Sequence, residues 1–118
     1  MKVSIITPVF NEPRIRYTLE SIRSQKDVPE LEIIVIDGDS TDETQDIIED
    51  YSDWIDVFVS EPDDGTYDAM NKGIITSQGE IIGIINSDDF YEMYTCELVS
   101  DIFKNNKNIH LVHGAMKK

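Results

Sequence analysis

The residues with the clearest chemistry are two adjacent carboxylates, Asp88 and Asp89, directly after the apolar run 81–85. A strand that is apolar on both faces is typical of the middle of a covered parallel sheet, so the pair is expected where a buried strand ends. Two like charges side by side repel, and a hard cation such as Mg²⁺ or Mn²⁺ relieves that repulsion and gains oxygen ligands. A turn or a helix N-cap is an equally good interpretation, because Asn and Asp are common in both.

The overall charge limits the partners of this chain. Its 118 residues include 24 acidic and 10 basic side chains, which gives a net charge of -14. Nucleic acid and anionic membranes are therefore excluded as direct partners. Between Asp37 and Asp64 there are twelve acidic residues and no Lys or Arg. A phosphate-bearing substrate would meet a repulsive field there unless cations screened it, although the five acids of the stretch 43–53 also fit a solvated helix face.

Composition predicts one domain in a reducing compartment. Cys96 is the single cysteine, which excludes an internal disulfide and a cysteine-based zinc cluster. We find no apolar stretch of the roughly 20 residues that a transmembrane helix needs, and no signal peptide before the first strand pattern. The expected location is the cytoplasm.

Hydrophobic patterns predict strands that alternate with helices. The predicted strands cover 3–7 (ended by Pro8), 31–36, 57–59, 81–85 and 109–112, and the predicted helices lie around 15–22, 40–51, 67–75 and 98–103. Ser40 and Glu43 have the spacing of a capping box. Tyr67, Met70 and Ile74 share a helical face and are predicted to face the core. This order predicts the α/β class, with a mostly parallel sheet and helices on both faces.

Polar loops follow three of the predicted strands, at 7–12, 37–40 and 86–89. In a parallel sheet these loops meet at one edge, where ligands bind. Phe10 could supply an apolar wall for a nucleotide base, Asp37 or Asp39 could bind a ribose, and a metal on the acidic pair could hold phosphates. The glycine motifs of NAD sites and P-loops are absent, so a divalent metal is the expected phosphate ligand.

The segments 3–12, 35–42 and 86–89 together resemble family 2 inverting glycosyltransferases of the GT-A fold, a Rossmann-like nucleotide-diphospho-sugar transferase fold. The segment 61–73 resembles a subgroup that builds bacterial surface polysaccharides. The resemblance covers essentially the whole chain. It implies that residues 1–118 are a single GT-A-type nucleotide-sugar-binding domain, the truncated N-terminal part of a longer glycosyltransferase.

The resemblance also implies roles for single residues. Asp89, with Asp88, would hold the Mn²⁺ or Mg²⁺ that bridges the donor's diphosphate, and Asp88 would also lie against the ribose or sugar. Lys72 would reach a phosphate oxygen, and a solvated helix residue is its alternative. The residues implied to line the nucleotide pocket are Pro8, Phe10, Asn11 and Glu12.

Two departures from the family pattern affect these expectations. Many relatives have two adjacent aspartates where this chain has Asp37 and Gly38, and the second commonly meets uracil. Either Asp37 or Asp39 compensates, or the base is held differently. A UDP-sugar is the first expected donor, with GDP- and dTDP-sugars as alternatives. The general base of the family is expected beyond Lys118.

Three functions follow as hypotheses. The first is metal-dependent transfer of a sugar with inversion to a saccharide or a lipid-linked saccharide, with the full-length protein peripheral at the inner face of the plasma membrane. The second is a fragment that binds the donor without transferring it. The third is a receiver-like signalling module, which would need its acidic pair just after the first strand.

Overall fold

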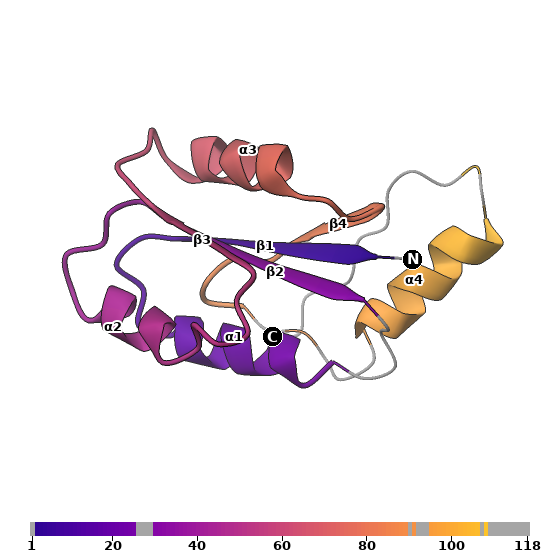
Figure 1. The fold of residues 1–118 in the computed structure, drawn as a ribbon, viewed down its shortest axis with the longest axis horizontal. Helices are drawn as coiled ribbons and strands as arrows, with labels where there is room; N and C mark the ends of the chain where they lie inside the picture. Colours follow the sequence, from indigo (N-terminus) through magenta and orange to yellow (C-terminus); the bar gives the residue numbers. More distant parts are fainter. Residues whose placement is uncertain (1, 26–29, 90, 92–94, 107, 109–118) are drawn as a thin grey trace.

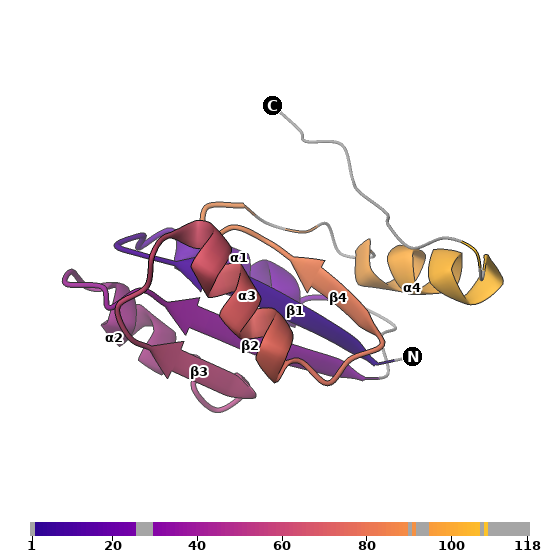
Figure 2. The same ribbon diagram turned by 90° about the horizontal axis from the view of Figure 1, so that it is seen from above.

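Four parallel strands form the centre of the protein. The structure is a computed structural model and describes residues 2–25, 30–89, 91, 95–106 and 108. The strands are β1 (Val3–Val9), β2 (Leu31–Asp37), β3 (Val57–Ser60) and β4 (Ile81–Ile84), and they pair in the order β3-β2-β1-β4. Figure 2 shows this order from above the sheet. The predicted parallel α/β fold is confirmed.

Helices cover both faces of the sheet. The helices α1 (Ile15–Arg23) and α2 (Thr44–Glu49) lie on one face, and α3 (Thr66–Thr76) lies on the other (Figure 1). The last described helix, α4 (Thr95–Asn105), lies beside the amino-terminal end of β1 in both views. Both central strands are buried almost throughout because β-branched residues fill both of their faces.

The hydrophobic core has two layers, one on each side of the sheet. On the α1 and α2 side it is built around Ile5, Leu19 and Ile48, and α4 adds the buried Cys96. On the α3 side it is smaller and consists of Ile6, Ile34, Ile36 and Ala69. The thinner layer follows from the residues that α3 presents to the sheet.

The helix α3 packs on β1 and β2 through small residues. Its buried residues are Ala69 and Gly73, and a Cβ placed on Gly73 would lie 2.4 Å from Cγ2 of Ile6. The prediction that Tyr67, Met70 and Ile74 face the core is wrong, since Tyr67 is 84% exposed and Ile74 is also exposed. Close approach of the helix backbone leaves no room for large side chains on that face.

Two strands differ from their predicted form. β1 continues through Pro8 to Val9. The backbone polar groups of alternate β1 residues point toward β4, as the Ile6 carbonyl does, and the backbone nitrogen of Pro8 lies on this same side. The pairing of β4 with β1 ends at Ile84, opposite Ile6. The missing N–H therefore costs no ladder bond. β4 lies at the end of the described sheet rather than in its middle, and Ile82 and Ile84 are exposed because α3 covers β1 and β2 instead. The predicted strand 109–112 lies outside the described residues.

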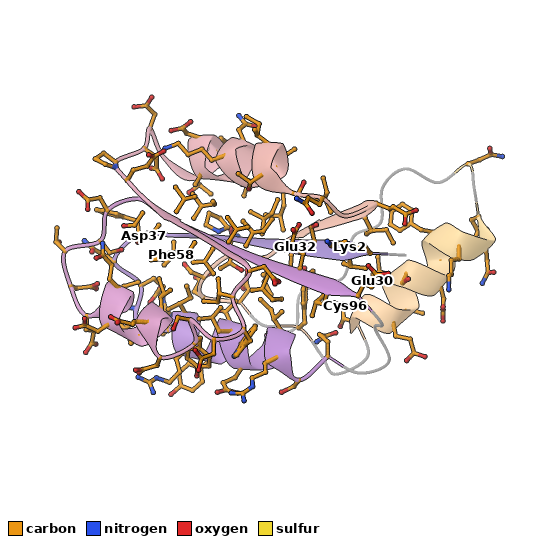
Figure 3. The ribbon with its side chains drawn as sticks, in the orientation of Figure 1. Lys2, Glu30, Glu32, Asp37, Phe58 and Cys96 are labelled. Atoms are coloured by element: carbon orange, nitrogen blue, oxygen red, sulfur yellow. The ribbon has the colours of Figure 1, made fainter. Side chains whose placement is uncertain are left out.

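A buried carboxylate joins elements at the amino ends of the strands. The Ser4 hydroxyl donates to Glu32 Oε1 (2.7 Å), and the backbone N–H of Gln78 donates to the same oxygen (2.9 Å). The N–H of Gly79 donates to Ser4 Oγ (2.8 Å). The connection between α3 and β4 is thereby held to β1 and β2. Figure 3 shows Glu32 and Lys2 far from Asp37, which lies at the other end of β2.

Replacing Gly73 with alanine should destabilise the fold. Overpacking a core typically costs about 1–3 kcal/mol, and the better helix propensity of alanine recovers at most about 1 kcal/mol. We expect Gly73→Ala to lower the free energy of unfolding in urea by about 1 kcal/mol or more. The control is Asn71→Ala on the exposed face of α3, which should be neutral or slightly stabilising. Equal stability of the two variants would contradict the close approach.

Acid should weaken the protein partly through Glu32. Burial works to raise the pKa of Glu32, but the Gln78 and Ser4 hydrogen bonds and the Lys2 charge together lower it below the ordinary 4.5. A lowered pKa in the folded state stabilises the fold above pH 4.5, and this stabilisation is lost as the pH falls through the folded value. The stability difference between wild type and Glu32→Gln should therefore shrink from pH 7 to pH 3 in urea titrations. The difference for the exposed Glu43→Gln should change less.

Candidate functional site

An open cavity of about 820 Å³ lies at the carboxyl ends of the strands. It is lined by the end of β1 and the loop after it (8–12), by Gly38 after β2, by the loop after β3 and the start of α3, and by 86–88 after β4. The strand order reverses between β1 and β4, because β1 pairs with β2 on one side and with β4 on the other. Loops diverge at such a switch point, and ligands of α/β proteins bind in the crevice between them.

The loop after β1 supplies the apolar part of the cavity. Pro8, Phe10, Asn11 and Glu12 all line it, and Phe10 is 59% exposed. Their contact with a nucleotide stays a prediction. Asn11 has a positive φ of 47°, a conformation that Asn adopts more readily than most residues. Its backbone N–H donates to Ser40 Oγ (2.8 Å), and its Oδ1 accepts from the N–H of Thr41 (2.8 Å). The loop is therefore fastened to the one after β2.

Glu12 is neutralised by its neighbour. The Arg14 guanidinium donates through Nη2 to Oε1 (2.6 Å) and through Nε to both carboxylate oxygens (3.1 Å each). These hydrogen bonds lower the pKa of Glu12. The charges of Arg14 and Glu12 therefore compensate each other at the edge of the cavity.

Asp37 is fully buried and lies outside the residues that line the cavity. Its Oδ2 accepts from the Ser40 N–H (3.1 Å), Gln45 Nε2 (3.0 Å) and the Ser60 hydroxyl (2.8 Å), and Oδ1 accepts from Ser40 Oγ. The carboxylate thus joins the ends of β2 and β3 to α2. A direct contact of Asp37 with nucleotide stays a prediction, and the structure gives this residue a positioning role.

The predicted capping box does not form. Ser40 uses its hydroxyl on Asp37 and Asn11, and the N–H of Thr44 bonds Oδ1 of Asp42 instead (2.9 Å). α2 therefore begins at Thr44, later than predicted. Asp39 is exposed with a φ of 69° and is not among the residues that line the cavity, so its nucleotide contact also stays a prediction.

The acidic pair forms the second half of a turn, 86–89, that α1 holds in place. The N–H of Asp89 donates to the carbonyl of Asn86 (3.0 Å), and the buried Thr18 hydroxyl donates to the carbonyls of Ser87 (3.0 Å) and Asp89. Asp88 is exposed and lines the cavity, and Asp89 is half-buried beside it. The turn interpretation is thus confirmed, and no hydrogen bond from another described residue occupies either carboxylate.

The described residues offer no group of three or more His, Cys, Asp or Glu side chains that could hold a metal ion by themselves. This donor set still fits Mg²⁺ or Mn²⁺ bound together with a diphosphate. Mg²⁺ commonly takes one or two carboxylates, and substrate phosphates and water complete its octahedron. Asp88 and Asp89 can supply the protein part of such a site.

Lys72 of α3 forms ion pairs with the loop that precedes this helix and with its own helix. Its Nζ is 3.0 Å from Glu61 Oε1 and 3.7 Å from Asp68 Oδ2, and it donates to the carbonyl of Pro62 (3.3 Å). The hydrogen bond with Glu61 raises the pKa of Lys72. Lys72 is not among the residues lining the cavity, so its contact with a phosphate stays a prediction.

Sequence reasoning missed the contribution of the loop after β3. Asp63 and Gly65 of this loop line the cavity, together with Tyr67 and Met70 of the following helix α3. The rule that identified the other loops, a polar segment at the carboxyl end of a strand, applies equally to residues 61–65. Its acidic residues were instead counted with the general charge of the chain.

Comparison with known families decides the class of protein. The family model "Glycosyl transferase family 2" matches residues 4–116. The chain belongs to glycosyl transferase family 2. The expected resemblance is therefore confirmed, and so is the GT-A fold.

Curated relatives are longer than this chain. "Putative glycosyltransferase EpsH" of Bacillus subtilis is 38% identical over 98 residues, which cover 80% of this chain and 28% of the relative. "Putative teichuronic acid biosynthesis glycosyltransferase TuaG" of the same species is 36% identical, with 74% and 36% covered. The chain spans between 28% and 45% of the curated relatives it matches.

Solved structures share the fold. The Staphylococcus aureus TarS fragment 1–349 in complex with UDP-GlcNAc has a TM-score of 0.81 and 27% identity, over 91% of this chain and 32% of that one. Mannosyltransferase PcManGT from Pyrobaculum calidifontis, in complex with GDP-Man and Mn²⁺, has a TM-score of 0.69 and 29% identity, over 76% and 28%.

Two other expectations can be compared with the structure. The order β3-β2-β1-β4 differs from the flavodoxin-like order 2-1-3-4-5 of receiver domains, which argues against the signalling hypothesis. Within the described residues, no helix combines the length and apolar character that crossing a membrane requires.

Asp37→Asn should disturb the loops that line the cavity by weakening the buried hydrogen bonds that hold them. The amide nitrogen would face one or more of the donors that the carboxylate now accepts, and an unsatisfied buried polar group costs about 1–3 kcal/mol. We expect a loss of this size in urea unfolding, with weaker nucleotide binding. Exposed Asp39→Asn is the matched control and should leave stability within about 0.5 kcal/mol of wild type. Unchanged stability in Asp37→Asn would contradict the positioning role.

Proposed function

We propose that this chain is the donor-binding part of a glycosyltransferase that moves a sugar from a nucleoside diphosphate sugar to an acceptor hydroxyl with inversion. The observation that carries the proposal is the cavity at the β1/β4 switch point, which has Phe10 at its wall and Asp88 at the end of β4, in a family 2 chain. Residues 1–118 form its single nucleotide-sugar-binding domain. The alternative of a fragment that binds without transfer is supported by the share of the relatives' length that the chain spans.

The cavity suits a nucleotide in size and in the placement of its groups. Its volume lies within the range of about 300–1,000 Å³ typical of small-molecule sites. Pro8 and Phe10 offer an apolar surface to a base, and Asn11 and Glu12 offer polar groups beside it. Asp88 lies in the loop after the neighbouring strand β4 and would contact the ribose, the sugar or the diphosphate.

Asp88 and Asp89 would hold Mn²⁺ or Mg²⁺ together with the donor's diphosphate. The crystallised complex of the structurally similar PcManGT with GDP-Man and Mn²⁺ supports a metal at this site. When bound, the cation offsets the negative charge that develops on the departing diphosphate, which is worth several kcal/mol of transition-state stabilisation. The turn held by Thr18 fixes the backbone that carries both carboxylates.

The donor and the acceptor follow from the relatives. A UDP-sugar is the first choice because TarS was crystallised with UDP-GlcNAc, and a GDP-sugar is the alternative that PcManGT supports. The similarity to the putative teichuronic acid biosynthesis glycosyltransferase TuaG supports a role in bacterial surface polysaccharide assembly. The acceptor would be a saccharide or a lipid-linked saccharide at the cytoplasmic side of the membrane. The general base would be supplied by residues beyond Lys118.

Nucleotide binding that depends on metal tests the proposal. We expect calorimetric titration of UDP or GDP to show at least about tenfold tighter binding with Mn²⁺ than with chelator, the size of one or two charge-assisted contacts. Asp88→Asn and Asp89→Asn should remove this difference, and exposed Asp53→Asn should keep it. Equal nucleotide affinity of the wild type with Mn²⁺ and with chelator would contradict the proposed role of Asp88 and Asp89. Release of sugar or its transfer by the isolated chain would exclude the binding-only alternative.

A further inference from the structure

One carboxylate in the cavity has no role in the site as described so far. Three acidic residues line the cavity: Glu12, Asp63 and Asp88. Glu12 is paired with Arg14, and Asp88 belongs to the proposed metal site. Asp37 and Asp39, the two acids considered from the sequence as partners of the base, lie outside the lining residues. Asp63 is the carboxylate that remains.

The Asp63 carboxylate occupies the space that a side chain at position 38 would need. A Cβ placed on Gly38 would lie 3.0 Å from Oδ2 and 3.2 Å from Oδ1 of Asp63. The carboxylate therefore packs directly against the backbone at the end of β2. A larger residue at position 38 would crowd this carboxylate and force it to shift.

Local structure fixes Asp63 in this place. Its Oδ1 accepts from the N–H of Gly65 (3.0 Å), an Asx turn that closes the loop before α3. Gly65 has a φ of 111°, which favours glycine. Within the described part of the chain, Oδ2 accepts no hydrogen bond, so one carboxylate oxygen is available to a ligand.

The strand order separates Asp63 from the proposed metal site. Gly38, on which Asp63 packs, follows β2, whereas Asp88 follows β4, and β1 lies between these two strands. Neighbouring strands are about 4.8 Å apart, so the two carboxylates lie on opposite sides of the β1 loop with Phe10. A nucleotide that places its diphosphate at Asp88 would place its base on the side of Asp63.

We propose that Asp63 reads the base of the donor by accepting a hydrogen bond from a ring N–H on its pairing edge. Uracil, thymine and guanine have such a donor, whereas cytosine and adenine have an acceptor at the corresponding nitrogen. A carboxylate accepts but does not donate, so it favours the first three bases and disfavours the other two. The inference rests on the proposed function and adds its base specificity.

The variant that tests this role is Asp63→Asn, with Asp64→Asn as the matched control. Asparagine keeps an Oδ1 acceptor for Gly65, so the turn is preserved, but its amide turns one acceptor into a donor. Asp64 is exposed and adjacent in the same loop, so its variant makes the same change in net charge. Gly38→Ala is a second variant, which crowds the Asp63 carboxylate without changing any charge.

Each protein is titrated with UDP, dTDP, GDP, CDP and ADP in Mn²⁺, and its thermal unfolding is recorded. We expect wild type and Asp64→Asn to bind UDP, dTDP or GDP at least about tenfold more tightly than CDP and ADP. Asp63→Asn should reduce this preference about tenfold or more, and Gly38→Ala should reduce it in the same direction by a smaller factor. Comparison of the affinities for UDP, dTDP and GDP shows which of these bases supplies the ring N–H that is bound.

The results separate failure of this inference from failure of the proposed function. If Asp63→Asn weakens the binding of all five nucleotides equally, or if the base preference survives, Asp63 shapes the loop and does not read the base. If wild type binds without base preference, the inference fails while donor binding stands. If wild type binds no nucleotide with or without metal, both are overturned.

Discussion

The buried carboxylate of Asp37 is the interaction on which the geometry of the site depends. A charge without access to water is tolerated only when its oxygens are well satisfied, and here the donors come from the β2–α2 loop, from α2 and from the end of β3. Ser40 extends the network, because its oxygen also accepts from the N–H of Asn11 in the β1 loop. One side chain thus fixes the loops after three strands relative to each other, which places Phe10 beside Gly38.

The same network explains why the role of Asp37 could not be predicted. An aspartate at the carboxyl end of a buried strand has the same local sequence whether it faces a ligand or the interior, and only the tertiary structure decides. Ser40 is a similar case, since its spacing to Glu43 is that of a capping box but Asp37 and Asn11 compete for its hydroxyl. Local patterns identified the right loops, and the burial of each residue assigned the roles within them.

The fold was more predictable than the site because strands and helices depend on periodicity within short segments. The parallel sheet, the helices on both of its faces and the edge where the polar loops meet followed from that alternation, whereas the strand order β3-β2-β1-β4 came from the structure. The errors concern neighbours in space: α3 buries Ala69 and Gly73 rather than its larger apolar residues, and β4 lies at the end of the described sheet. Asp63 was missed for the same reason, since its relation to Gly38 joins residues 25 positions apart.

The distribution of charge is the physical reason for proposing a cation that binds together with the donor. The described lining contains no Lys or Arg, because Arg14 is paired with Glu12 and Lys72 with Glu61 and Asp68. The amino end of α3 adds only a partial positive charge. A diphosphate entering this acidic cavity would therefore be repelled unless a divalent ion came with it. Of the carboxylates that line the cavity, Asp88 would then lie at the end proposed for the cation and Asp63 at the end proposed for the neutral base.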